Sequence, residues 1–190
     1  MSADLYELLR QSVVDAPVVM KGEYAYFIHP LSDGVPIQSA ELLSAARDLI
    51  YDKVDWDDVD LILGIEAMGI PLATALSLKS GKPLVVGRKR SYGLPGEYAI
   101  DQTTGYSKGE IYLNDIKKDD KVFIVDDVVS TGGTLLPILK AIDTIGARVA
   151  DCWIIFEKGE GMNYVREHGD WPLNSLVRIK MDGDKVTLSE

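Results

Sequence analysis

Cysteine is nearly absent from this 190-residue chain, since Cys152 is the only one. A single thiol excludes an internal disulfide and fits a reducing compartment, so we expect a cytoplasmic protein. Cys152 lies in an apolar run, which predicts a packed thiol rather than a nucleophile. Long apolar runs are also missing, so we expect neither a membrane-spanning segment nor a secretory signal peptide.

Positive charge is scarce as well. The chain has 20 lysines and arginines against 30 aspartates and glutamates, which gives a formal net charge of −10. This balance argues against a nucleic-acid or anionic-membrane partner, although a local basic pocket for a phosphorylated substrate remains compatible with it. The hydrophobic content of 46% and the length predict one globular domain with a sizeable core.

The pattern with the most chemical content lies at residues 122–145. Four apolar residues predict a buried parallel strand, and two carboxylates, Asp126 and Asp127, follow it directly. A hydroxyl-rich glycine turn comes next, and apolar residues at helical spacing begin at Leu135. In open α/β sheets, ligands bind beyond the carboxyl ends of the strands, and free N–H groups at a helix start attract anions. The predicted phosphate-binding turn is Ser130, Thr131, Gly132, Gly133 and Thr134.

The two carboxylates require a different partner, because they would repel a phosphate. We expect Asp126 and Asp127 to accept hydrogen bonds from sugar hydroxyls, or to hold a metal ion directly or through its water shell. The turn lacks the Gly-Lys-Ser/Thr ending of a nucleotide-triphosphatase loop, which disfavours that class.

Two further loops are predicted at the same edge of the sheet. A strand at 59–63 leads into a turn at 64–69 and a helix from residue 70. A strand at 83–86 runs into Arg88, Lys89 and Arg90, whose charges fit a diphosphate, although a solvated charge run is the alternative. The glycine-punctuated segment that follows, to residue 109, is typical of a lid; a mobile hairpin without a chemical role is the alternative.

The remaining patterns place a small hood at residues 1–38 before a core at 39–190 that carries a lid at about 88–110. Phe27 in the hood either stacks on a flat base or packs the hood onto the core, and His29 is expected to be a hydrogen-bonding loop residue. Lys158 lies just beyond the end of an expected strand at 149–156. It either donates to the exocyclic oxygen of a 6-oxopurine or forms a surface pair with Glu157. Other elements are expected as helices at 4–14, 39–51 and 163–168, strands at 18–20, 24–28 and 176–179, and a final hairpin around 182–183.

Residues 122–135 closely resemble the 5-phosphoribosyl-1-pyrophosphate (PRPP) motif of type I phosphoribosyltransferases. The hood, the loop at 66–69, the cations at 88–90 and the Glu-Lys-Gly at 157–159 extend the resemblance over nearly the whole chain. It is greatest to the archaeal hypoxanthine/guanine phosphoribosyltransferases, which are themselves close to adenine phosphoribosyltransferases. The resemblance implies an α/β fold with a central, mostly parallel sheet flanked by helices. It also implies magnesium as cofactor and a homodimer.

The implied activity is purine salvage, in which a purine base and PRPP give a nucleoside monophosphate and pyrophosphate. By this resemblance Asp126 and Asp127 hold the ribose hydroxyls and the metal, and residues 130–134 hold the 5-phosphate. Ala67, Met68 and Gly69, together with the cations at 88–90, bind the pyrophosphate. The catalytic residues are Asp126, Asp127, Ser130 and Arg88. Phe27 and Lys158 bind the base, with hypoxanthine and guanine preferred.

The chain departs from the family pattern in two places. Ala67-Met68 stands where adenine-specific relatives often carry Ser-Arg, and Ser130 stands where many hypoxanthine/guanine enzymes carry a proton-accepting aspartate. Serine is a poor base, which leaves the proton acceptor and the purine choice open. The alternatives are an adenine phosphoribosyltransferase, an enzyme for xanthine or a pyrimidine, and a non-catalytic PRPP-sensing regulator of the same fold. A regulator would need a DNA-binding extension or a basic face, and the sequence indicates neither.

Overall fold

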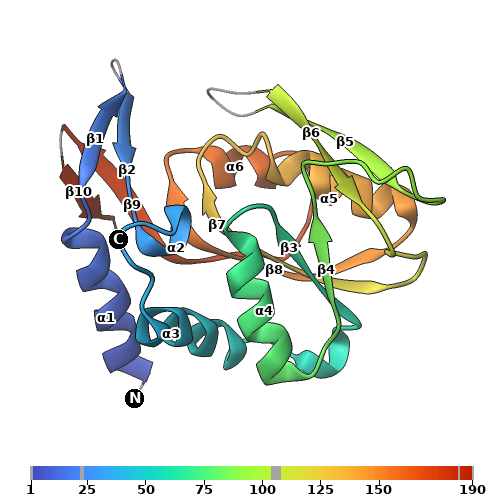
Figure 1. Ribbon diagram of the computed structural model, residues 1–190, viewed down its shortest axis with the longest axis horizontal. Helices are drawn as coiled ribbons and strands as arrows, with labels where there is room; N and C mark the ends of the chain where they lie inside the picture. The colour runs from blue at the N-terminus through green and yellow to red at the C-terminus, as the bar shows by residue number, and fades with distance from the viewer. Residues whose placement is uncertain (1, 22–23, 104–107, 184, 190) are drawn as a thin grey trace.

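The computed structural model describes residues 2–21, 24–103, 108–183 and 185–189. A six-stranded sheet in the order β10-β9-β8-β7-β3-β4 forms its centre (Figure 1). Its strands are β3 (Leu61–Ile65), β4 (Leu84–Gly87), β7 (Lys121–Val129), β8 (Arg148–Lys158), β9 (Leu173–Asp182) and β10 (Lys185–Leu188). Neighbouring strands run parallel except for the antiparallel pair β9–β10, so the predicted mostly parallel sheet is confirmed.

Helices cover both faces of the sheet. They are α1 (Ser2–Val14), α2 (Pro30–Asp33), α3 (Ala40–Tyr51), α4 (Gly69–Ser80), α5 (Leu135–Ile145) and α6 (Gly161–Arg166), with a 3₁₀ turn at Trp56–Asp58. Two antiparallel hairpins stand apart from the sheet: β1 (Val18–Lys21) with β2 (Tyr24–Phe27), and β5 (Tyr98–Thr103) with β6 (Lys108–Leu113). Figure 1 shows both hairpins rising on the same side of the molecule.

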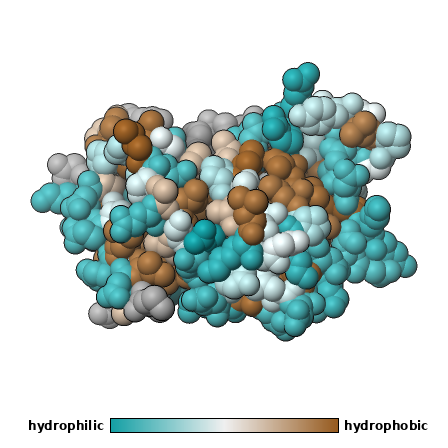
Figure 2. Space-filling view, turned by 60° about the horizontal axis from the view of Figure 1, so that its bottom comes forward, coloured by the Kyte–Doolittle hydropathy of each residue, from teal (hydrophilic) through white to brown (hydrophobic). Residues whose placement is uncertain are grey.

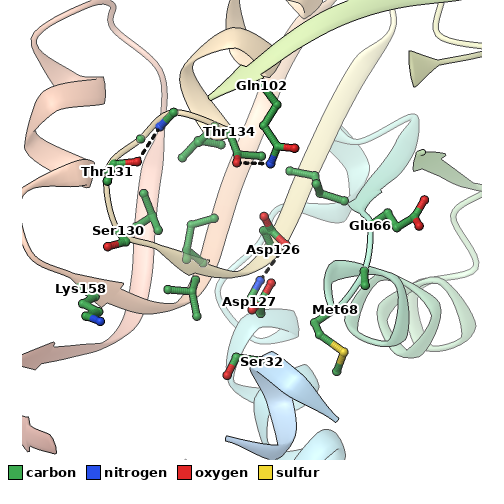
Figure 3. Close-up of a pocket in the computed structure, with 18 of the residues that line it drawn as sticks. Ser32, Glu66, Met68, Gln102, Asp126, Asp127, Ser130, Thr131, Thr134 and Lys158 are labelled. Carbon is green, nitrogen blue, oxygen red and sulfur yellow. Dashed lines mark hydrogen bonds between the residues drawn. The ribbon is translucent and has the colours of Figure 1, made fainter. Parts of the chain in front are cut away.

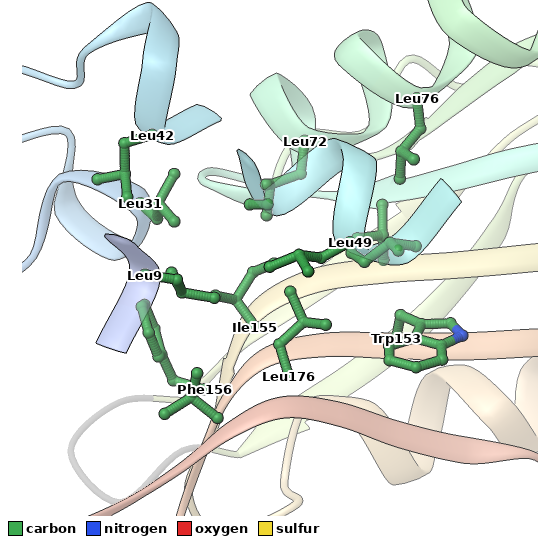
Figure 4. Close-up of a cluster of buried hydrophobic side chains, with 14 of the residues drawn as sticks. Leu9, Leu31, Leu42, Leu49, Leu72, Leu76, Trp153, Ile155, Phe156 and Leu176 are labelled. Carbon is green, nitrogen blue, oxygen red and sulfur yellow. The ribbon is translucent and has the colours of Figure 1, made fainter. Parts of the chain in front are cut away.

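Successive side chains of the buried strands point to opposite faces of the sheet, so the protein has two hydrophobic cores. Ile62, Phe123 and Val125 face one side, where they pack against α1, α3 and α4; Figure 4 shows this core. Leu63, Ile124 and their neighbours face the other side, where they pack against α5, α6 and the β5–β6 hairpin. A parallel strand buried on both faces must be apolar at every position, which explains the continuous hydrophobic runs in the sequence.

Most expected elements are present with shifted ends. The helix expected at 39–51 begins at Ala40, because the Ser39 side chain caps it by accepting a hydrogen bond from the N–H of Leu42. The segment expected as a lid loop at about 88–110 contains an irregular stretch at 89–97, then β5 and the start of β6; residues 104–107 lie outside the described residues. Helix α2 was not predicted from sequence, since four residues are too few to show helical periodicity.

The surface is polar with scattered apolar side chains. Figure 2 shows one face, where brown hydrophobic groups gather between teal polar ones. Ile37 and Leu78 are the most exposed large hydrophobic residues, at 90% and 84% of their possible area. Within the described part of the chain, no helix has the length and apolar character needed to cross a membrane.

Candidate active site

A cavity of about 540 Å³ opens beyond the carboxyl ends of β3, β7 and β8 (Figure 3). This edge is where ligands usually bind in open parallel sheets. Segments that are far apart in the chain meet there. Its lining consists of residues 26–27, 32, 65–68, 89, 102, 126–135, 154 and 158.

The turn at 130–134 joins β7 to α5 along one wall of the cavity. Gly132 has φ of +78°, a backbone conformation that a side chain would strain. A Cβ built on Gly161, the first residue of α6, would lie 2.4 Å from the Ser130 carbonyl oxygen and 2.8 Å from the Gly132 nitrogen. Both glycines therefore let α6 pack directly against the turn. Helix α5 starts at Leu135 without a side-chain cap, so its first N–H groups remain available to an anion.

The two carboxylates lie next to this turn, near the end of β7. The backbone N–H of Asp127 donates to Asp126 Oδ1 at 3.0 Å (Figure 3). Burial raises the pKa of Asp126 to about 6. The pKa of Asp127 lies well above its usual value, first because of burial and then because Asp126 is adjacent. Two adjacent like charges in this half-buried position are costly, so the pair requires a proton, a cation or hydrogen-bond donors from a ligand.

The loop at 66–69 forms the opposite wall. A Cβ on Gly69 would lie 2.8 Å from the Val125 carbonyl oxygen and 3.0 Å from Asp126 Oδ1, so this glycine permits close packing against β7. The Glu66–Ala67 peptide bond is cis. Glu66 accepts a hydrogen bond from the N–H of Lys89 at 2.9 Å, which ties this loop to the end of β4. These contacts favour a role for Glu66 in shaping the loop.

The three consecutive cations have different surroundings. Lys89 lines the cavity, whereas Arg88 and Arg90 do not. Arg88 Nε lies 3.0 Å from Glu66 Oε2, an ion pair without the alignment of a hydrogen bond. Arg90 lies over the ring of Tyr92, 5.8 Å from its centre. The structure therefore brings only Lys89 of this group to the cavity.

Phe27 and Lys158 both line the cavity, at its hood and β8 sides. Phe27 is 6% exposed; it stacks on His29 with ring centres 5.3 Å apart and meets the edge of Phe156 at 5.4 Å. It thus packs the hood onto the core while its remaining surface borders the site. Glu157 is buried and accepts hydrogen bonds from Ser175 at 2.7 Å and Arg178 at 3.2 Å. It is therefore not a surface residue, as the alternative of a surface pair with Lys158 would require.

Gln102 and Ser32 line the cavity without having been predicted from sequence, and Tyr26, an aromatic that like Phe27 could stack on a base or pack the hood, lines it as well. Gln102, on β5, donates from Nε2 to Thr134 Oγ1 at 2.6 Å and so links the lid hairpin to the glycine turn. Ser32 and Tyr26 both donate to the carboxylate of Asp33, at 2.7 and 2.8 Å. Figure 3 places Ser32 beside Asp127. No local pattern distinguishes these side chains, because only the packing of hood and hairpin onto the sheet brings them to the site.

His29 organises the hood beneath these residues. Its Nδ1 accepts a hydrogen bond from the N–H of Leu31 at 3.1 Å, which caps α2 and leaves Nε2 to donate to Ser12 Oγ at 3.0 Å. Burial lowers the pKa of His29 to about 4, so the ring is neutral near pH 7. The expectation of a hydrogen-bonding rather than catalytic histidine agrees with these contacts.

A glycine turn that leads from a buried parallel strand into a helix, with an acidic pair beside it, points to a class of protein. Residues 38–176 match the model of the phosphoribosyl transferase domain family, and the chain belongs to this family.

Its relatives make the comparison more specific. The chain is 49% identical to a hypoxanthine/guanine phosphoribosyltransferase of Methanosalsum zhilinae, over 98% of this chain and 97% of that one. It is 51% identical to a protein of the same name from Ferroglobus placidus, over 95% of both. Among solved structures, adenine phosphoribosyltransferase from Rhodothermus marinus superposes with a TM-score of 0.73 at 22% identity, covering 93% of this chain and 99% of that one. This last similarity demonstrates the fold alone.

Proposed function

We propose that this protein transfers the 5-phosphoribosyl group of PRPP to hypoxanthine or guanine, giving IMP or GMP and pyrophosphate. The observation that carries the proposal is the meeting of Asp126, Asp127 and the 130–134 turn in one cavity with Lys158. The turn suits a 5-phosphate, the acidic pair suits the ribose hydroxyls, and the space beside Lys158 is left for a base. The two relatives named above carry this activity in their names.

The reaction breaks the bond between the ribose C1 and the pyrophosphate oxygen, which leaves with the electron pair, and forms a bond from C1 to a purine nitrogen. We assign the leaving pyrophosphate to the backbone of Ala67, Met68 and Gly69 and to the side chain of Lys89. Charge stabilisation of the departing group is the main contribution expected of these residues. Arg88 acts through Glu66 in this arrangement, because both groups hold the loop against β4.

The base is read by Lys158, whose ammonium donates to the 6-oxo group of hypoxanthine or guanine. The 6-amino group of adenine would present donors to this cation, which disfavours adenine. Phe27 supplies an apolar edge at the hood side. Ser130 offers the purine a hydrogen bond but is a poor acceptor for the proton lost from its ring.

Magnesium is the implied cofactor. Among the residues described, no group of three or more histidine, cysteine, aspartate or glutamate side chains could hold a metal ion. Asp126 and Asp127 offer two carboxylates with raised pKa values, and protein magnesium sites often combine one or two carboxylates with substrate phosphates. The residues therefore fit magnesium that binds together with PRPP, where it would neutralise diphosphate charge.

A homodimer and a cytoplasmic location complete the proposal. The exposure of Ile37 and Leu78 supports a subunit interface, since large apolar groups left in water often mark one. The thiol of Cys152 is buried, in keeping with a reducing compartment. The lid at about 88–110 is proposed to close over the reacting groups and exclude water.

The test is product formation from PRPP and magnesium with hypoxanthine, guanine, adenine and xanthine offered separately. We expect turnover of hypoxanthine and guanine, lost in Asp126→Asn/Asp127→Asn. Lys158→Gln should lower kcat/KM for both bases by about tenfold to a hundredfold, because a charged hydrogen bond is removed, while exposed Lys140→Gln should not. Turnover of adenine alone would refute the role of Lys158. Tight PRPP binding without turnover of any base would instead favour the regulator.

A further inference from the structure

A second cavity, of about 430 Å³, lies away from the active site. Residues of α1, α6, β9 and the end of β10 line it, so it sits where the N-terminal helix meets the last strands of the sheet. Tyr6 closes one side, where its hydroxyl donates to the Leu176 carbonyl oxygen. The volume is large enough for a small anion or for the phosphate end of a larger metabolite.

The charge of this cavity is opposite to that of the protein. Arg10, Arg166 and Arg178 line it, which is three of the chain's seven arginines, and among the residues that the structure describes, which end at 189, no aspartate or glutamate lines it. Arg178 pairs with Glu157 outside the lining, at 3.2 Å, so an anion between the three guanidinium groups would relieve the remaining repulsion among them.

The hydrogen-bonding state of the arginines supports this reading. Arg10 makes no hydrogen bond or ion pair with any described residue. Arg166 contacts only neutral acceptors, Asn163 Oδ1 at 3.3 Å and the Leu173 carbonyl at 3.4 Å. Arg178 donates from Nε to Glu157, and its two terminal nitrogens have no hydrogen-bond partner among residues 2–21, 24–103, 108–183 and 185–189. Among the described residues, a carboxylate therefore engages only Nε of Arg178 in this group of three.

From these observations we infer that this arginine cavity, defined by Arg10, Arg166 and Arg178, binds a small phosphate-bearing molecule. Guanidinium groups match phosphate oxygens in pairs, and Ser189 in the lining adds a hydroxyl donor. The ligand is either a free phosphate or the phosphate group of a nucleotide, since both present the same oxygens. The inference does not depend on the proposed reaction.

The test is a site-resolved titration of the isotope-labelled protein by NMR, with inorganic phosphate, GMP and guanosine at constant ionic strength. The backbone amides of residues 173–178 report the arginine cavity, and those of residues 130–134 report the active site. We expect phosphate and GMP to shift the 173–178 amides saturably, and guanosine to leave them unchanged. Equal affinity for phosphate and GMP would identify the bare anion as ligand, whereas tighter GMP binding would identify a nucleotide.

The variants avoid Arg178, because its loss would leave Glu157 buried without its cation. Arg10→Gln/Arg166→Gln should weaken binding at residues 173–178 by about a hundredfold, roughly tenfold per guanidinium, and leave the active-site amides responsive. Arg148→Gln/Lys140→Gln removes the same charge from exposed positions outside both cavities and should keep the binding.

Three results would overturn the inference. One is the absence of any shift at residues 173–178 up to about 10 mM ligand. Another is an equal loss of binding in both double variants, which would indicate net charge alone. The third is a shift of the 173–178 amides with protein concentration alone, in step with self-association measured by sedimentation, which would make the arginine cavity a contact between copies.

Discussion

Asp126→Asn should make the protein more stable while it removes activity. Burial beside Asp127 raises the pKa of Asp126 from 3.8 to about 6, so ionising this carboxyl costs the native state free energy. About two pKa units correspond to roughly 3 kcal/mol at most above pH 6. Asparagine removes that penalty, and its Oδ1 can still accept the hydrogen bond from the Asp127 N–H.

The sign of the pH dependence distinguishes this explanation from improved packing. Between pH 3.8 and about 6 the native state binds more protons at Asp126 than the unfolded chain does, so stability falls as pH rises. The advantage of Asp126→Asn should therefore be near zero at pH 4 and reach its full value above pH 6. At pH 7.5 it should raise Tm by roughly 5–10 °C, given the typical unfolding entropy of a chain this size.

The assay is urea and thermal unfolding of both proteins from pH 4 to 7.5, at one protein concentration, because self-association would shift the midpoints. Comparing the two proteins cancels contributions such as that of His29, whose lowered pKa makes stability fall as pH drops from 6.5 to about 4. Asp57→Asn, an exposed substitution with the same charge change, should have little effect. An advantage of equal size at pH 4 and 7.5, or none at either, would refute the reasoning.

Three further predictions concern the glycine turn, the lid and the hood. Gly161→Ala should cost about 1–3 kcal/mol of unfolding free energy and weaken PRPP binding, because its Cβ would press on Ser130; unchanged binding by calorimetry would contradict this. Gln102→Leu should tighten PRPP binding by about threefold to tenfold, because it frees the Thr134 hydroxyl; weaker binding would show that the amide serves the substrate. In His29→Asn, the decrease in unfolding free energy between pH 6.5 and about 4, measured with urea, should disappear, since a neutral amide replaces the titrating ring. A decrease as large as that of the wild-type protein would rule this out.

Local sequence determined the parallel sheet and the position of the chemistry. Unbroken apolar runs mark strands buried on both faces, and such strands place their carboxyl ends at one edge. The acidic pair and the 130–134 turn follow such a run directly, so their proximity needs no tertiary information. The same holds for the loop at 66–69, which follows β3 and meets β7 through parallel pairing.

Tertiary packing decided which of the candidate side chains reach the cavity. Lys89 lines it while its neighbours Arg88 and Arg90 do not, because Glu66 engages Arg88 from a segment more than twenty residues earlier. Gln102 arrives through the lid hairpin, a placement with no local signal.

The arginine cavity is the clearest case of this division. Arg10, Arg166 and Arg178 are far apart in the chain, and each one alone reads as an ordinary surface cation. Strand order and helix packing bring them together, and neither is encoded in any short stretch of residues. Sequence therefore determined the chemistry that adjoins each strand, whereas contacts between distant segments decided how the charges are grouped.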